Sequence, residues 1–322
     1  MSTLAFTTTS ANFAVAGNPY TSTLVATGGT PPYTWAVVSG LPVWVSLNTA
    51  TGVLTGNPAA SDVGNFSPTF RILDTTGKSA TGAVLLAIHP RTDRVSVDAS
   101  GTAGNGASTE SVLNSSDGRF IAFTSLATTL TALPGASGSQ IFLQDRQTNQ
   151  PSLISSDNLG NASNGASSQP TISADGRFVA FTSAATNLAS VVGGSGTQIF
   201  LRDTQANQTI LVSRDTVGNA GNGASSEATI SANGQFVAFT SLATTLAAIP
   251  GGSGSQIFIR DTLGNQTGLV SEDNSAPASA GNGASSAPST TGDGEFVAFV
   301  SLASNLVPGA NAASQVYVRA IP

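Results

Sequence analysis

Beyond residue 90, the chain repeats one pattern of apolar and polar positions four times. Each copy contains a polar turn followed by an apolar run, at residues 117–123, 175–181, 233–239 and 293–299. The copies start 58, 58 and 60 residues apart. In residues 178–181 both alternating sets of positions are apolar, which predicts a strand covered on both of its faces.

Two further segments recur in step with the first. One begins with Gln and occupies residues 140–143, 198–201, 256–259 and 315–318. The other follows it at residues 153–157, 211–215 and 269–273, but its fourth copy precedes all the others, at residues 94–98. With a short strand before each turn, every repeat has four strands, A to D, and the last repeat lacks only strand D.

The displaced copy at residues 94–98 predicts how the repeats close. A sheet that lacks its outer strand has a free edge, which promotes aggregation unless another strand covers it. If residues 94–98 supply that strand, the first and last repeats meet. The pattern therefore predicts a four-bladed β-propeller closed by a displaced N-terminal strand.

Residues 1–88 do not contain this repeat. Short alternating runs are separated by turns such as residues 28–32 and 75–78, which predicts a small β-sandwich. Residues 89–93 are then a linker, and residues 94–322 form the propeller. The whole chain is predicted to be all-β.

Both parts resemble known families. The residues Ser-x-Asp-Gly-Arg-Phe-Val-Ala-Phe, then Ile-Phe-Leu-Arg-Asp and Leu-Val-Ser, are similar to the TolB-like, WD40-related (PD40-type) β-propeller repeat of bacterial proteins. Residues 32–35, 45–58 and 64–74 resemble the immunoglobulin-like domain common in bacterial surface proteins. That resemblance implies a spacer or docking module. Relatives of the repeat often carry an acidic loop before strand C, whereas Gly and Ser fill it here, which argues against an inherited cation site.

The composition removes many kinds of chemistry. Only 9% of residues are charged, and the chain has no Cys, one His and one Lys. These numbers exclude a Cys nucleophile and a thiolate or multi-histidine zinc site. A net charge of -6 without a basic patch argues against nucleic acid as a partner. The chain has no stretch of 18 apolar residues, so insertion into a membrane is not predicted.

Aspartates recur at the end of the third segment and are weak candidates for a Ca²⁺ site: Asp98, Asp157, Asp215 and Asp273. We expect them instead to fix their own turns, since each loop offers one carboxylate. No cofactor is expected. Glu110 and Glu227 interrupt the repeat near the predicted pore mouth and are the candidate carboxylate pair for hydrolysis.

The long loops connecting strands D to A and B to C are predicted to share one face, where binding residues usually gather. They repeat two kinds of residue, which are the candidates for an interaction face: Asn105, Asn164, Asn222 and Asn282, with Leu126, Leu188, Leu242 and Leu302. The leucines of these loops could alternatively pack between blades, or form an apolar rim for another protein chain.

We therefore expect a non-enzymatic structural or adhesive protein of an extracellular assembly, either a phage virion or a bacterial surface. Its partners would be other proteins, with self-association as a further option. The first seven residues lack the pattern of a signal peptide, which favours the virion. The alternatives are a glycan- or small-ligand-binding propeller and a carboxylate-dependent hydrolase.

Overall fold

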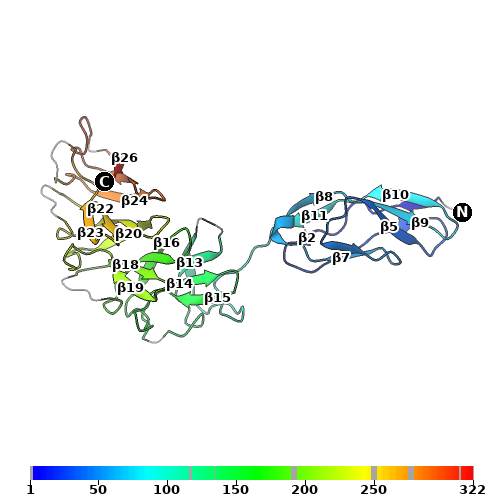
Figure 1. Cartoon of the computed structure of the whole chain (residues 1–322), viewed down its shortest axis with the longest axis horizontal. Helices are drawn as coiled ribbons and strands as arrows, with labels where there is room; N and C mark the ends of the chain where they lie inside the picture. The colour runs from blue at the N-terminus through cyan, green and yellow to red at the C-terminus, as the bar shows by residue number, and fades with distance from the viewer. Residues whose placement is uncertain are drawn as a thin grey trace. The chain divides into compact units, whose positions relative to one another are not determined.

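The computed structural model describes residues 3–114, 116, 118–133, 135–189, 194–247, 252–274, 279–311 and 313–321. The chain divides into two compact units, Met1–Asp93 and Arg94–Pro322, drawn in blue to cyan and in green to red in Figure 1. In the described ranges, strands are interrupted by a single short 3-10 helix, η1 (Ala60–Asp62). The all-β prediction is therefore confirmed. No helix in these ranges is long and apolar enough to cross a membrane.

The first unit consists of four small sheets around one core. Their strand orders are β1-β4, β10-β9-β5, β2-β11-β8 and β3-β7-β6. Trp35, Leu54, Phe70 and Leu86 are buried in this core, and polar residues between them face outward. The strands are β1 (Ala5–Phe6), β2 (Ala14–Val15), β3 (Tyr20–Thr23), β4 (Ala26–Thr27), β5 (Thr34–Ser39), β6 (Val45–Leu47), β7 (Val53–Gly56), β8 (Gly64–Phe66), β9 (Thr69–Leu73), β10 (Ser79–Ala83) and β11 (Leu86–His89).

The second unit contains four antiparallel sheets, one for each repeat. The first three have four strands and the last has three, as the repeat pattern predicts. The first sheet is β12 (Ser108–Leu113), β13 (Phe120–Ser125), β14 (Gln140–Asp145) and β15 (Gln150–Leu153), and the second is β16 (Ser167–Ile172), β17 (Phe178–Ser183), β18 (Gln198–Asp203) and β19 (Gln208–Leu211). The third is β20 (Ser225–Ile230), β21 (Phe236–Ser241), β22 (Gln256–Asp261) and β23 (Gln266–Leu269), and the fourth is β24 (Ser285–Thr290), β25 (Phe296–Ser301) and β26 (Gln315–Ala320).

Each sheet packs face to face on the next one. Ile141 and Leu143 of the first sheet share a buried cluster with Val179 and Phe181 of the second. Equivalent clusters join the second sheet to the third and the third to the fourth. The apolar residues on both faces of strands B and C are therefore explained, because those strands lie between neighbouring sheets. A fully buried Phe contributes about 1.5–3 kcal/mol to stability.

The row of sheets is open in this single chain. The recorded contacts between sheets join each sheet to the next one in sequence, and Figure 1 shows the first and fourth sheets at opposite ends of the row. Among the described residues, the only β-bridge of segment 94–98 joins Val97 to Ala103. The predicted pairing of this segment with the fourth sheet is thus absent here. This segment stays beside the first sheet, where Val95 packs against the cluster of Phe123 and Phe142, while the fourth sheet lies at the other end of the row.

Some residues of the sequence patterns fall outside the described ranges. They are the turn residue Asp117 and, in the loops before strand C, Pro134, Gly193 and Gly251.

Candidate protein interaction site

Glu110 and Glu227 connect neighbouring sheets through backbone bulges. Each lies where the pairing of strands A and B shifts register, with a positive φ of 51° and 56°. The Glu110 carboxylate accepts hydrogen bonds from the Thr124 hydroxyl at 2.7 Å and from the backbone N–H of Gln169, in the second sheet, at 2.8 Å. The bulge is what turns the side chain toward the next sheet.

The same contact continues along the row. Gln169 accepts from the N–H of Glu227 at 3.3 Å, and Glu227 accepts from the N–H of Ala287 at 2.9 Å. The series ends at Ala287, whose methyl group has no acceptor. Gln169 therefore lies between the two glutamates, and each carboxylate already has donors from the protein. Within the described ranges, no group of three or more His, Cys, Asp or Glu side chains is placed to hold a metal ion.

Three of the four recurring aspartates organise their own turns, and the fourth, Asp273, contacts another loop. Asp98 Oδ1 accepts from the hydroxyl and N–H of Ser100, at 2.6 and 2.9 Å, and from the N–H of Thr102 at 2.9 Å. Asp157 and Asp215 bind the second and fourth residues after them in the same way. Asp273 is buried and accepts from the Asn305 side-chain amide at 3.2 Å.

These hydrogen bonds stabilise the charged form of the aspartates. The pKa of Asp98 is lowered, first by the Ser100 hydroxyl and then by the N–H of Thr102. At Asp157, burial raises the pKa, but the side chain and backbone of Asn161 and the N–H groups of Leu159 and Gly160 lower it overall. The carboxylate oxygens accept hydrogen bonds from N–H and O–H donors of the turn. Stabilising the turn is therefore sufficient to explain why an aspartate recurs at this position.

A second set of aspartates ends strand C and forms ion pairs. Arg119 donates to both oxygens of Asp145, at 2.8 and 2.6 Å, and Arg177 does the same to Asp203, at 3.0 and 2.7 Å. The Arg119 guanidinium holds the pKa of Asp145 well below its usual range. In the third sheet, Gln235 replaces the arginine and donates to Asp261 at 3.1 Å.

The four candidate asparagines join the two sets of long loops. Asn164 donates to the Thr186 hydroxyl at 2.9 Å and accepts from the Thr186 N–H at 2.8 Å. Asn105, Asn222 and Asn282 make the equivalent pair of bonds with Thr128, Thr244 and Ser304. Their side-chain oxygens and nitrogens are therefore engaged within the loops, although the residues are exposed.

The structure separates the candidate leucines into two sets. Leu126, Leu242 and Leu302 are exposed by 59%, 58% and 48%. Leu188, by contrast, is buried in the cluster between the first and second sheets, so its prediction as an interaction residue is wrong. Its repeat equivalents Leu130, Leu246 and Leu306 are buried too, because they come four residues later in the loop. The residue in the second sheet that matches the exposed leucines is Ala184. We call the three exposed leucines the leucine rim.

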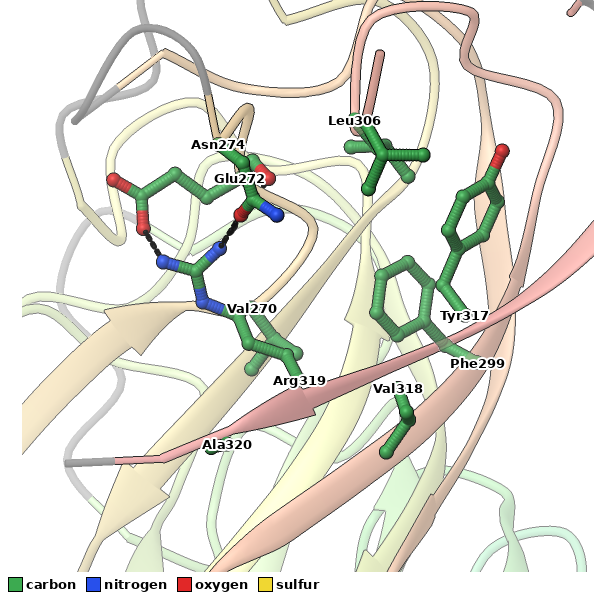
Figure 2. A pocket seen from close by; sticks show the side chains of 10 residues that line it. Val270, Glu272, Asn274, Phe299, Leu306, Tyr317, Val318, Arg319 and Ala320 are labelled. Atoms are coloured by element: carbon green, nitrogen blue, oxygen red, sulfur yellow. Dashed lines mark hydrogen bonds and ion pairs between the residues drawn. The ribbon is translucent and has the colours of Figure 1, made fainter. Parts of the chain in front are cut away.

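One pocket was not anticipated from the sequence. It has a volume of about 320 Å³ and lies beside the free edge of the fourth sheet. Figure 2 shows Phe299 and Tyr317 on one side of it and Arg319, held by Glu272 and Asn274, on the other. The rings of Phe299 and Tyr317 are stacked with centroids 5.8 Å apart. The only signal for it in the sequence was the missing strand D.

The N-terminal unit has a recognisable family relationship. Residues 3–88 match the family model He_PIG, described as "Putative Ig domain". The resemblance of this part to an immunoglobulin-like domain is therefore confirmed. No curated protein sequence matches the chain.

Solved structures of low identity resemble larger parts of the chain. A structure described as "putative TolB from Agrobacterium tumefaciens" is 13% identical, with a TM-score of 0.42, over 80% of this chain and 73% of that one. The tricorn protease is 15% identical, with a TM-score of 0.39, over 80% of this chain and 25% of the protease. The α-L-arabinofuranosidase Arb93A from Fusarium graminearum is 12% identical, with a TM-score of 0.32, over 89% of this chain and 76% of that one.

Proposed function

We propose that this chain is a non-enzymatic structural or adhesive protein of an extracellular assembly, in a phage particle or on a bacterial surface. Its four sheets would act as propeller blades that present loops to other proteins. The observation that carries this proposal is the leucine rim. Leu126, Leu242 and Leu302 are exposed on loops whose recurring asparagines are engaged within the loops themselves.

The chemistry of these loops favours protein contact over catalysis or sugar binding. The connections at residues 126–139, 184–197, 242–255 and 302–314 contain no charged and no aromatic residue. Sugar sites commonly offer aromatic platforms, and active sites offer convergent polar groups with shifted pKa values. Exposed apolar side chains that form one patch are typical of protein interfaces instead, and the leucine rim is proposed as such a patch.

The location can be tested by following the protein into assembled particles. Mass spectrometry of purified virions and of sheared surface structures should find the wild-type chain in one of these fractions. A variant with Leu126, Leu242 and Leu302 all replaced by Asn should fold but be depleted from that fraction. Leu263→Asn is the matched control, because Leu263 is equally apolar and 80% exposed but lies in the β22–β23 turn, at the opposite end of the strands.

Two outcomes would contradict the proposal. The first is recovery of the wild-type chain only as a soluble protein inside the cell. The second is that the triple variant enters the particles as well as the Leu263→Asn control does.

A further inference from the structure

The fourth sheet exposes residues that are buried in every other sheet. Val316 and Val318 of β26 are 77% and 69% exposed, whereas their equivalents Ile257 and Ile259 in β22 are 0% and 6% exposed. In the first three sheets, the equivalent side chains are covered by the following sheet and by an outer strand. The fourth sheet has neither in this chain.

The pocket beside β26 marks the position of the missing strand. Its lining residues Val270, Phe299, Leu306 and Tyr317 are the repeat equivalents of a buried group one sheet earlier. That earlier group is Val212, Phe239, Leu246 and Phe258, and Leu269 of the outer strand β23 packs against it. In the fourth sheet no side chain takes the place of Leu269, and the space is the pocket seen in Figure 2.

A buried polar contact repeats at the same place. In the third sheet, the Ser271 hydroxyl donates to the Gln256 side-chain oxygen at 2.6 Å, and the N–H of Ile257 donates to that hydroxyl at 3.0 Å. The first and second sheets contain the same contact, between Ser155 and Gln140 and between Ser213 and Gln198. In the fourth sheet, Gln315 is exposed.

The chain contains a segment that matches this vacant position. Residues 94–98 align with residues 269–273, so that Ser96 corresponds to Ser271 and Val95 to Val270. Arg94 corresponds to Leu269, and its long apolar stem could cover the Phe299 and Tyr317 rings. This segment lies at the first sheet, where Val95 packs beside Phe123 and Leu130. Ile154 packs in the same way beside Phe181 and Leu188 of the second sheet.

The two ends of the row are also complementary in shape. Phe120, Phe178 and Phe236 each lie against a glycine of the next sheet: Gly176, Gly234 and Gly294. Phe296 of the fourth sheet is exposed and has no following sheet, while Gly118 of the first sheet has no such ring beside it. Leu113 at the first sheet is exposed too, although its equivalents Ile172 and Ile230 are buried.

We infer that the fourth sheet binds a second copy of this chain, which supplies its residues 91–98: residues 91–94, the equivalents of β23, as the fourth strand, and Ser96 for the polar contact that follows it. The N–H of Val316 would donate to the Ser96 hydroxyl of that copy, and Phe296 would cover its Gly118. The partner is another copy because this chain's own segment lies at the other end of an open row. The contact is head to tail, so copies form a closed ring or a filament. The inference rests on the proposed function only in treating the sheets as propeller blades.

Disulfide trapping tests this register directly, since the chain has no cysteine. Directly opposed residues of antiparallel strands have Cα atoms about 4.5–5.5 Å apart, which suits a disulfide. In the first and third sheets the opposed pairs include Leu143 with Ser152 and Ile259 with Gly268, and their equivalents are Val318 and Asp93. Full-length Asp93→Cys and Val318→Cys chains, mixed and oxidised, should form a covalent pair containing one of each. The double variant Asp93→Cys/Val318→Cys should form dimers and larger species. The control Leu143→Cys/Ser152→Cys should close within one chain, because that pair is already formed in the first sheet.

The inference fails if the double variant oxidises completely within single chains, which would mean that each ring closes on itself. It also fails if the mixed single variants stay unlinked under conditions in which the control pair oxidises fully.

Native mass measurement gives an independent test. The wild-type chain should contain two or more copies over a dilution series, and Val318→Asp should weaken this association at least about tenfold. Val318 is exposed in the single chain, so the variant should keep the wild-type fold, which its circular dichroism spectrum checks. A wild-type chain that is monomeric throughout the series would overturn the inference. The leucine-rim variant should still associate, so failure here and failure of the proposed function are distinguishable.

Discussion

The Phe178 ring of the second sheet lies directly against Gly234 of the third. A Cβ atom at Gly234 would stand 2.2 Å from the ring, far inside van der Waals contact. The pairs Phe120 with Gly176 and Phe236 with Gly294 repeat this relationship at 2.2 and 2.3 Å. Each glycine also has a positive φ, of 76–81°. The glycine-containing turn of each of these sheets therefore packs directly against a phenylalanine ring of the preceding sheet.

Gly234→Ala should destabilise the second unit by about 2–4 kcal/mol, since it adds a clash to the cost of a left-handed alanine. Gly160→Ala is the matched control, with a φ of 87° and nothing within 4 Å of an added Cβ. It should lose only about 1 kcal/mol. Urea unfolding of both variants measures the difference, and equal losses would contradict the packing explanation.

The bulge residues predict which substitutions the inner strands tolerate. Glu110→Gln and Glu227→Gln should unfold close to the wild type, because Gln169 makes the same contacts at the same repeat position. Glu110→Ala should lose about 0.5–1.5 kcal/mol for each bond to Thr124 and Gln169. Chemical denaturation measures these changes. A Gln variant as unstable as the Ala variant would show that charge, and not hydrogen bonding, matters there.

The ion pairs at the ends of strands β14 and β18 predict a dependence of stability on pH. The pKa of Asp145 and of Asp203 is lowered in the folded chain, chiefly by Arg119 and Arg177. Such carboxylates stabilise the fold above their unfolded pKa of about 4, and this contribution is lost as the pH falls below it. Arg119→Gln, which imitates Gln235 of the third sheet, should flatten the loss of stability between about pH 5 and pH 2. Unchanged pH dependence in thermal unfolding would argue against this origin.

The hydrogen bonds of the aspartate turns predict that Ca²⁺ does not change the stability of the chain. Asp157 accepts from the N–H groups of Leu159 and Asn161 and from the Asn161 side chain, so its oxygens are occupied. Adding Ca²⁺ or a chelator should leave the unfolding temperature unchanged, whereas Asp157→Ala should lose about 1 kcal/mol. Differential scanning calorimetry checks both statements. A rise in the unfolding temperature with Ca²⁺ that Asp157→Ala abolishes would restore the metal-site hypothesis.

Local patterns predicted the recurring elements well, because strands and tight turns depend on nearby residues. The apolar runs at residues 120–123 and 178–181 form strands buried on both faces, and Asp98 and Asp157 form their turns. The function of the loop leucines could not be predicted in this way. Leu126 is exposed and Leu188 is buried because they hold different positions in the repeat, Leu188 being the equivalent of Leu130, but the repeat alone does not say which of the two positions faces a neighbouring sheet. Which of them faces the neighbouring sheet depends on the path of the loop between two sheets.

The sequence by itself determined that this protein is all-β, that four related sheets follow an immunoglobulin-like unit, and that the last sheet lacks its outer strand. These properties follow from periodicity within each repeat. Only the tertiary structure decided that the row stays open, with Val316 and Val318 exposed at one end and Leu113 at the other. The angle between sheets comes from contacts such as Phe178 with Gly234, which lie 56 residues apart in the chain. The angle between sheets cannot be predicted from a local pattern of apolar residues, because it is set by how side chains of separate repeats pack together.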